Sequence, residues 1–314
     1  MRYKALIVSI KGTKLSKKER ILIAKYKPWG VILFKRNLKN ISQIKSLIFN
    51  IKKLARNKKF PIIIDEEGGS VSRLSGLINH DISAYFFGNL FSKNRNFCVK
   101  IYKQYIYSLI KTLNNLGINV NTIPVLDILR NNTNKVIGTR SFSKNKKIVK
   151  ELGALTIKLL HKKKILGIIK HIPGHGASTS DSHKKTPKIS LTPKKLNEID
   201  FYPFKKINAK LAMTAHIIYT KLDKKNVATF SKKIINEVIR KKIGFRGILI
   251  SDDISMKALK YDLVTNAKKS IAAGCNVVLY CSGDINDNFK LIKSLPYIDK
   301  FTSKKTSEIY KFLR

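Results

Sequence analysis

Short apolar, β-branched runs recur along the chain at intervals long enough for an intervening helix. Most of these runs are continuous rather than alternating, which is typical of strands buried on both faces of a parallel sheet. The pattern predicts strands at residues 6–10, 30–34, 61–65, 121–128, 167–171, 211–216, 247–253 and 276–280.

Amphipathic stretches separate these runs and predict helices, most clearly at residues 40–55 and 145–163. In the second stretch, Ile148, Leu152 and Leu155 recur close to the helical period of about 3.6 residues. Strands alternating with helices predict an α/β fold, a single (β/α)8 TIM-type barrel. A doubly wound open sheet fits less well, because the last unit ends neatly near the C-terminus. No linker or shift in composition divides the chain, so one domain over residues 1–314 is expected.

Ionisable side chains gather at the predicted C-terminal ends of the strands, where the active site of such a barrel forms. Lys170, His171 and His216 stand at two of these ends. Asp127, taken alone, is interpreted as a residue that merely marks a strand-to-loop turn. The acidic residues at the strand ends, out of 19 in the whole chain, are Asp65, Glu66, Glu67, Asp127, Asp252 and Asp253. So many ionisable strand ends predict one shared polar pocket.

The stretch KHIPGHGASTSDSH, residues 170–183, holds three of the six histidines and raises three interpretations. Zinc binding by His171 and His175 is disfavoured, because the Pro-Gly pair between them breaks the helix that would align them. A phosphate cradle is disfavoured because the glycines lack the order of a phosphate-binding loop. Proton transfer is favoured, since Asp181 and His183 face the same way in an extended loop and a carboxylate orients an imidazole. No metal site is expected.

The charge and the cysteines narrow the class of protein. The net charge of +45 comes from 64 Lys+Arg against 19 Asp+Glu, an excess that is typical of nucleic-acid binders. The lysines are scattered and accompanied by many Ile and Asn, which favours compositional drift over a specific nucleic-acid site.

Cys98, Cys275 and Cys281 are an odd number, which argues against a disulfide framework. The N-terminal apolar run is too short for a secretory signal, and no run reaches the roughly 18 residues of a membrane span. A cytoplasmic protein is expected.

Several stretches together resemble glycoside hydrolase family 3 β-N-acetylglucosaminidases, the enzymes of bacterial cell-wall recycling. The loop at 170–183 and the SDDISM motif are the most specific of them. In family order, the matching stretches are IDEEGGSVSRL (64–74), IPVLDI (123–128), IGTRSFS (137–143), the loop at 170–183, MTAHI (213–217) and LISDDISMKAL (249–259).

The resemblance implies roles for individual residues. Asp252 corresponds to the nucleophile, and His183 corresponds to the general acid/base with Asp181 as its partner. The sugar-binding positions correspond to Asp65, Arg73, Arg140, Lys170 and His171. The implied activity is a retaining exo-β-N-acetylglucosaminidase that removes terminal, non-reducing N-acetylglucosamine from muropeptides through a covalent glycosyl-aspartate, without a cofactor. A monomer is expected.

Some residues have a structural interpretation beside the functional one. Asp253 and His175 are interpreted as shaping the loops rather than as catalytic. Arg73 has a second interpretation, a salt bridge to Glu66 or Glu67, which is compatible with sugar binding.

The chain departs from the family pattern at four positions. Family members usually carry Gln in place of Glu66, Arg in place of Ser70, and Asp in place of both Thr139 and Ala177. The chain leaves no room after the barrel for the second domain of many family 3 β-glucosidases, which favours the single-domain branch. A family 3 glycosidase of other specificity, a phosphorylase, and a basic nucleic-acid-binding protein on a non-catalytic barrel remain as alternatives.

Overall fold

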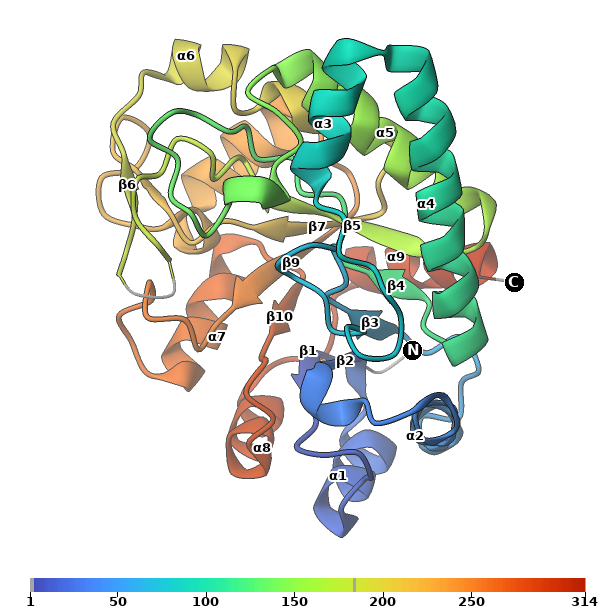
Figure 1. Cartoon of the computed structure of the whole chain (residues 1–314). Coiled ribbons are helices and arrows are strands. Elements are labelled where there is room, and N and C mark those ends of the chain that lie inside the picture. Colours follow the sequence, from blue (N-terminus) through green and yellow to red (C-terminus); the bar gives the residue numbers. More distant parts are fainter. Residues whose placement is uncertain (1–2, 183–184, 314) are drawn as a thin grey trace.

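The computed structural model describes residues 3–182 and 185–313 and shows a closed parallel barrel. Around the barrel the strand order is β1, β2, β3, β4, β5, β7, β9 and β10, and β10 pairs with β1 to close the sheet. Figure 1 shows the strands in the centre with helices around them. The strands are β1 (Lys4–Ser9), β2 (Pro28–Leu33), β3 (Ile62–Ile64), β4 (Val120–Asn121), β5 (Leu166–Ile172), β7 (Leu211–Thr214), β9 (Ile248–Asp253) and β10 (Val277–Leu279). The predicted (β/α)8 barrel is confirmed.

The strands form where the sequence has continuous apolar runs. Every residue of β2, β5 and β7 is buried, because the barrel interior covers one face and the helices cover the other. All pairings within the barrel are parallel, so the C-terminal ends of all its strands meet at one rim. That rim is where loops can bring distant side chains together.

A helical segment follows each barrel strand. The helix α2 begins after Asn40, whose side chain accepts a hydrogen bond from the Gln43 amide, and it buries Ile44, Leu47 and Ile48 against the barrel. The helices are α1 (Lys17–Ile21), α2 (Ile41–Leu54), α3 (Ala84–Lys93), α4 (Arg95–Leu116), α5 (Lys146–Lys162), α6 (Pro193–Glu198), α7 (Leu263–Ala273), α8 (Ile285–Ser294) and α9 (Lys300–Phe312), with π-helical turns at Leu22–Tyr26 and Ile234–Lys242. The helices predicted at 40–55 and 145–163 are confirmed as α2 and α5.

The fourth strand is much shorter than the predicted run at 121–128. The β4 ladder stops after Asn121, and Pro124 lies in the middle of the predicted strand. Proline has no amide proton, so it cannot donate to the neighbouring strand. Pairing resumes beyond it, where the Leu126 amide donates to the Lys170 carbonyl over 2.7 Å. The interruption frees residues 122–128 to shape the rim.

A second, two-stranded sheet lies outside the barrel. It pairs β6 (Lys188–Ile189) with β8 (Ile218–Tyr219), and it was not predicted from the sequence. Both strands belong to connections at the C-terminal rim, so this sheet joins two of the loops that surround the barrel mouth. Within the described residues, no helix is long and apolar enough to cross a membrane.

Candidate active site

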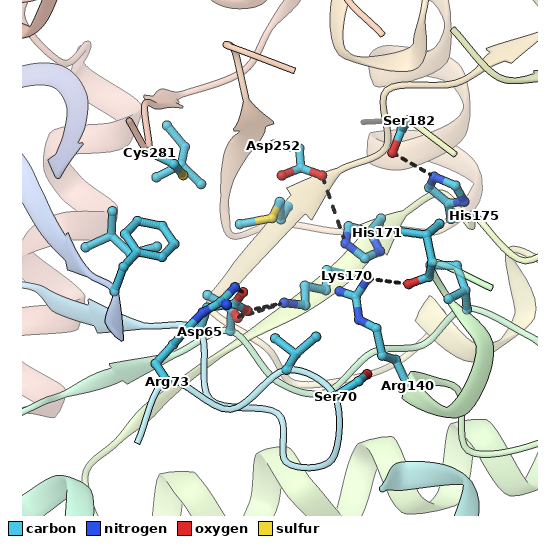
Figure 2. Close-up of a pocket in the computed structure, with 18 of the residues that line it drawn as sticks. Asp65, Ser70, Arg73, Arg140, Lys170, His171, His175, Ser182, Asp252 and Cys281 are labelled. Atoms are coloured by element: carbon cyan, nitrogen blue, oxygen red, sulfur yellow. Dashed lines mark hydrogen bonds and ion pairs between the residues drawn. The ribbon is translucent and has the colours of Figure 1, made fainter. Parts of the chain in front are cut away.

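A cavity of about 320 Å³ opens at the C-terminal rim of the barrel. Figure 2 shows side chains from β5 and β9, and from the segments that follow β3, β4, β5 and β10, lying around it. The predicted site residues that line the cavity are Asp65, Arg73, Arg140, Lys170, His171 and Asp252, and further polar lining residues include Ser70, Thr122, Lys135, His175, Ser182 and Cys281. The structure therefore brings together residues that are far apart in the sequence.

Asp65 follows β3 and is the centre of one ion-pair cluster. Its carboxylate accepts from Arg73 Nη2 and from Lys170 Nζ, each over 2.7 Å, and it also contacts the Thr122 hydroxyl. Burial alone would raise the pKa of Asp65, but Lys170, Arg73 and Arg140 outweigh burial and hold the pKa far below its ordinary value. Asp65 is therefore ionised and firmly oriented toward the cavity.

A tight turn after Asp65 brings Arg73 back to the cavity. Gly68 has φ +86°, and a Cβ there would lie 2.3 Å from the Tyr105 hydroxyl, so only glycine fits. The Glu66 carboxylate accepts from the backbone amides of Arg73 and Leu74 over 2.6 and 2.8 Å. The alternative salt bridge from the Arg73 guanidinium to Glu66 or Glu67 is wrong, because that guanidinium pairs with Asp65.

Glu67 joins two of the expected sugar-binding cations. Arg140 donates to both of its carboxylate oxygens over 2.8 Å, and Lys170 Nζ lies 2.5 Å from one of them. All three side chains are largely buried. Burial would raise the pKa of Glu67, but the two cations outweigh it and lower the pKa. The pairing fixes Arg140 and Lys170 in place before any ligand binds.

Asp127 holds the loop that begins at His171. Its carboxylate is fully buried, and it accepts from His171 Nδ1 over 2.7 Å and from the His175 amide over 2.6 Å. Burial would raise its pKa, yet the His171 ring and the His175 amide keep the pKa below its ordinary value. The interpretation of Asp127 as a turn residue alone is wrong, since it orients a ring that lines the cavity.

Asp252 and Asp253 end β9 and have different surroundings. The Asp252 carboxylate lies 4.0 Å from His171 Nε2 and accepts from the Asp253 amide over 2.8 Å. Although burial favours its neutral form, His171, His216 and the amide lower the pKa of Asp252, so it is ionised at neutral pH. Asp253 instead accepts from the Ser255 hydroxyl and amide, and burial raises its pKa. These contacts agree with the interpretation that Asp253 shapes the loop.

The loop after β5 carries the expected proton-transfer pair. His183 lies outside the described residues, so its expected place in the cavity stays a prediction. Asp181 is partly exposed and is not among the described residues that line the cavity, whereas the next residue, Ser182, does line it. Within residues 3–182 and 185–313, no group of three or more His, Cys, Asp and Glu side chains is arranged to hold a metal ion.

The positions that depart from the family pattern differ in their surroundings. Glu66 is buried and supports the turn before Arg73, whereas Ser70 lines the cavity itself. Thr139 is exposed and Ala177 is partly buried.

Two residues of the site were not singled out from the sequence. Glu67 was visible as one of three consecutive strand-end acids, but nothing local indicated that its partners are Arg140 and Lys170. Thr122 contacts both Asp65 and Lys170, and a threonine beside a strand carries no sequence signal for such a role.

The ionised Asp252 carboxylate and the charged side chains around the cavity supply a nucleophile and hydrogen-bonding groups, both of which glycoside hydrolysis uses. The model of the glycosyl hydrolase family 3 N terminal domain matches residues 3–305, so the chain belongs to glycosyl hydrolase family 3. The β-hexosaminidase of Nitrosomonas eutropha is 33% identical over 297 residues, which cover 93% of this chain and 84% of the relative. The β-hexosaminidase of Haemophilus influenzae is 31% identical over 304 residues, which cover 93% of this chain and 85% of that relative.

The solved structures agree with this assignment. The crystal structure of NagZ from Neisseria gonorrhoeae in complex with N-trifluoroacetyl-D-glucosamine has a TM-score of 0.89 at 28% identity, covering 98% of this chain and 90% of that one. Within family 3, the chain is therefore a glycoside hydrolase of the β-hexosaminidase group, and the resemblance seen in the sequence is confirmed.

Proposed function

We propose that the protein is a retaining exo-β-N-acetylglucosaminidase that removes terminal, non-reducing N-acetylglucosamine from peptidoglycan fragments. The observation that carries the proposal is the ionised Asp252 carboxylate at a cavity lined by the Asp65, Arg73 and Lys170 cluster. A volume of about 320 Å³ is near the lower end for small-molecule pockets, which favours one terminal sugar over an extended chain.

In the proposed mechanism, an Asp252 oxygen attacks the anomeric carbon while the bond to the leaving oxygen breaks. His183 gives its proton to the leaving oxygen, and Asp181 supports the protonated imidazole. Water then attacks the glycosyl-aspartate, His183 takes a proton from that water, and the Asp252 carboxylate is released. Two inversions at the same carbon give net retention.

The proposed sugar contacts come from charged groups that are already paired with each other. Asp65 accepts hydrogen bonds from sugar hydroxyls, while Arg73, Arg140 and Lys170 donate to sugar oxygens. His171 has its Nδ1 on Asp127, which leaves Nε2 directed toward Asp252 and the reacting carbon. Because these groups are held by one another, sugar binding does not have to order them first.

The gonococcal NagZ complex with N-trifluoroacetyl-D-glucosamine supports N-acetylglucosamine as the sugar. The peptidoglycan substrate, a role in cell-wall recycling, a cytoplasmic location, a monomeric state and one catalytic domain over residues 1–314 belong to the same proposal.

The test compares hydrolysis of an aryl β-N-acetylglucosaminide with hydrolysis of the matching aryl β-glucoside. We expect turnover of the first, a far lower kcat/KM for the second, and initial release of the β-anomer. Asp252→Asn abolishes turnover, whereas the neighbouring Asp253→Asn retains part of it. Added phosphate distinguishes hydrolysis from phosphorolysis, because a phosphorylase would release N-acetylglucosamine 1-phosphate. Equal turnover of both glycosides, or full activity of Asp252→Asn, would reject the proposal.

A further inference from the structure

His175 occupies a buried position between the sugar pocket and the loop that leads to residue 183. Its backbone amide donates to Asp127 Oδ1 over 2.6 Å, and the same carboxylate accepts from His171 Nδ1. The His175 ring turns toward the loop, where Nε2 lies 3.3 Å from the Ser182 hydroxyl, as Figure 2 shows. One carboxylate thus anchors both a cavity-lining ring and the residue that reaches Ser182.

Ser182 is held a second time through its backbone. Its carbonyl accepts from the Ala258 amide over 3.1 Å, and Ala258 lies in the loop after the strand that carries Asp252. The Ala258 carbonyl in turn accepts from the Thr186 hydroxyl over 2.7 Å. The chain on both sides of residues 183–184 is therefore tied to one residue of the loop that follows Asp252.

The ring of His175 is suited to a positioning role. Burial lowers its pKa to about 4, so the ring is neutral when the enzyme works near neutral pH. A neutral imidazole exchanges a hydrogen bond with a hydroxyl without bringing a charge into the interior. The ring is buried and the proposed chemistry gives it no proton to transfer, so its contact with Ser182 needs another explanation.

We propose that His175 is a positioning residue: its contact with Ser182 holds the described chain that leads to the proposed general acid, His183. The inference rests on the proposed role of His183 as the general acid. A donor held a fraction of an ångström away from its aligned position transfers its proton less well, although the fold and the sugar pocket are intact.

The test uses Ser182→Ala and His175→Phe, with His175→Gln as the conservative variant, whose side-chain amide can again meet the Ser182 hydroxyl. The kcat/KM value is measured for N,N′-diacetylchitobiose, whose sugar leaving group needs a proton, and for a dinitrophenyl N-acetylglucosaminide, whose leaving group does not. We expect about a ten-fold loss on chitobiose, less than about a two-fold loss on the dinitrophenyl substrate, and partial recovery in His175→Gln.

The matched control is Ser178→Ala, another buried serine of the same loop, whose hydroxyl donates to the Ser180 carbonyl instead. It should have little effect on either substrate. The double variant Ser182→Ala/His175→Phe should lose no more than either single variant, because both remove the same contact. If His175→Phe does not fold, the test compares the kcat/KM losses of Ser182→Ala with those of Ser178→Ala.

Three outcomes would overturn the inference: equal losses on the two substrates, equal losses in Ser178→Ala and Ser182→Ala, or additive losses in the double variant. His183→Ala separates this failure from that of the proposed function. If His183→Ala shows the leaving-group dependence and Ser182→Ala does not, only the positioning role falls. If His183→Ala itself shows no such dependence, the proposed role of His183 as general acid is rejected, and the positioning role of His175 is rejected with it.

Discussion

Glu67 offers a direct test of whether the buried ion pairs hold the site together. Its carboxylate accepts two hydrogen bonds from Arg140 and lies 2.5 Å from Lys170 Nζ. The exposed fractions of the Glu67, Arg140 and Lys170 side chains are 5%, 12% and 3%, so little water can take the place of a lost partner. Glu67→Gln keeps the shape of the side chain, but its amide has only one oxygen and turns an N–H group toward a cation.

The expected cost follows from leaving the buried Arg140 guanidinium without its carboxylate partner, while Lys170 keeps its pair with Asp65. Breaking a buried pair by removing one partner costs about 3–5 kcal/mol. For a chain of this size, about 2 °C of melting temperature is lost per kcal/mol, so the expected decrease in Tm is about 6–10 °C. The control is Glu151→Gln, which breaks the Arg95–Glu151 pair on the surface, where the Arg95 side chain is 60% exposed and the Glu151 side chain is 43% exposed. A surface pair contributes at most about 1 kcal/mol, so its Tm should fall by no more than about 2 °C.

The pH dependence of the stability of Glu67→Gln gives a second measurement of the same prediction. The pKa of Glu67 is lowered in the folded protein, because Arg140 and Lys170 outweigh the effect of burial. Its contribution to stability is therefore complete above the ordinary glutamate pKa of 4.5 and is lost as the pH falls through the lower, folded-state value. The Tm difference between wild type and Glu67→Gln, measured by calorimetry, should shrink below that pH. Equal Tm losses in Glu67→Gln and Glu151→Gln at neutral pH would refute the reasoning.

Three further predictions concern chemistry and charge. His183→Ala should slow cleavage of a glycosidic bond with a sugar leaving group by about 10²–10⁴-fold, and it should affect a nitrophenyl substrate least. Asp181→Asn should reproduce part of this defect. Near-normal turnover of chitobiose by His183→Ala would contradict the prediction. The acid limb of kcat/KM should lie below pH 3.8, since the pKa of Asp252 is lowered despite burial, and His171→Asn should move that limb to higher pH because it removes the largest of the lowering contributions. Duplex DNA should bind only with a Kd of about 10⁻⁴–10⁻⁶ M at physiological salt, and a salt-resistant nanomolar complex in a fluorescence titration would contradict compositional drift as the origin of the +45 charge.

The barrel and much of the pocket were predictable because they depend on local pattern. Continuous apolar runs marked the buried strands, and parallel topology brings all strand ends to one rim. That reasoning placed Asp65, Lys170, His171 and Asp252 together, and the structure agrees. The fourth strand was predicted too long, because apolar residues continue past Asn121 while Pro124 interrupts the ladder.

The partners of the site residues were not predictable, because they depend on contacts between distant segments. Arg140 pairs with Glu67, which is 73 residues away, and no local spacing selects Glu67 over Glu66. Asp127 accepts a hydrogen bond from the His175 amide, which is 48 residues away in the sequence. The sequence around Asp127 therefore gave no sign that it orients this loop. In each case the choice of partner depends on the paths of loops around the rim.

In the proposed mechanism, Asp252 forms a covalent bond with the sugar. The most direct measurement is mass spectrometry of peptides after incubation with a fluorinated N-acetylglucosamine analogue whose glycosyl-enzyme turns over slowly. We expect one added glycosyl mass on the peptide that carries SDDISM, with fragmentation placing it on Asp252, and no label in Asp252→Asn. A label on Asp253 or Asp65, or turnover of the analogue through a non-covalent route with retained configuration, would contradict it.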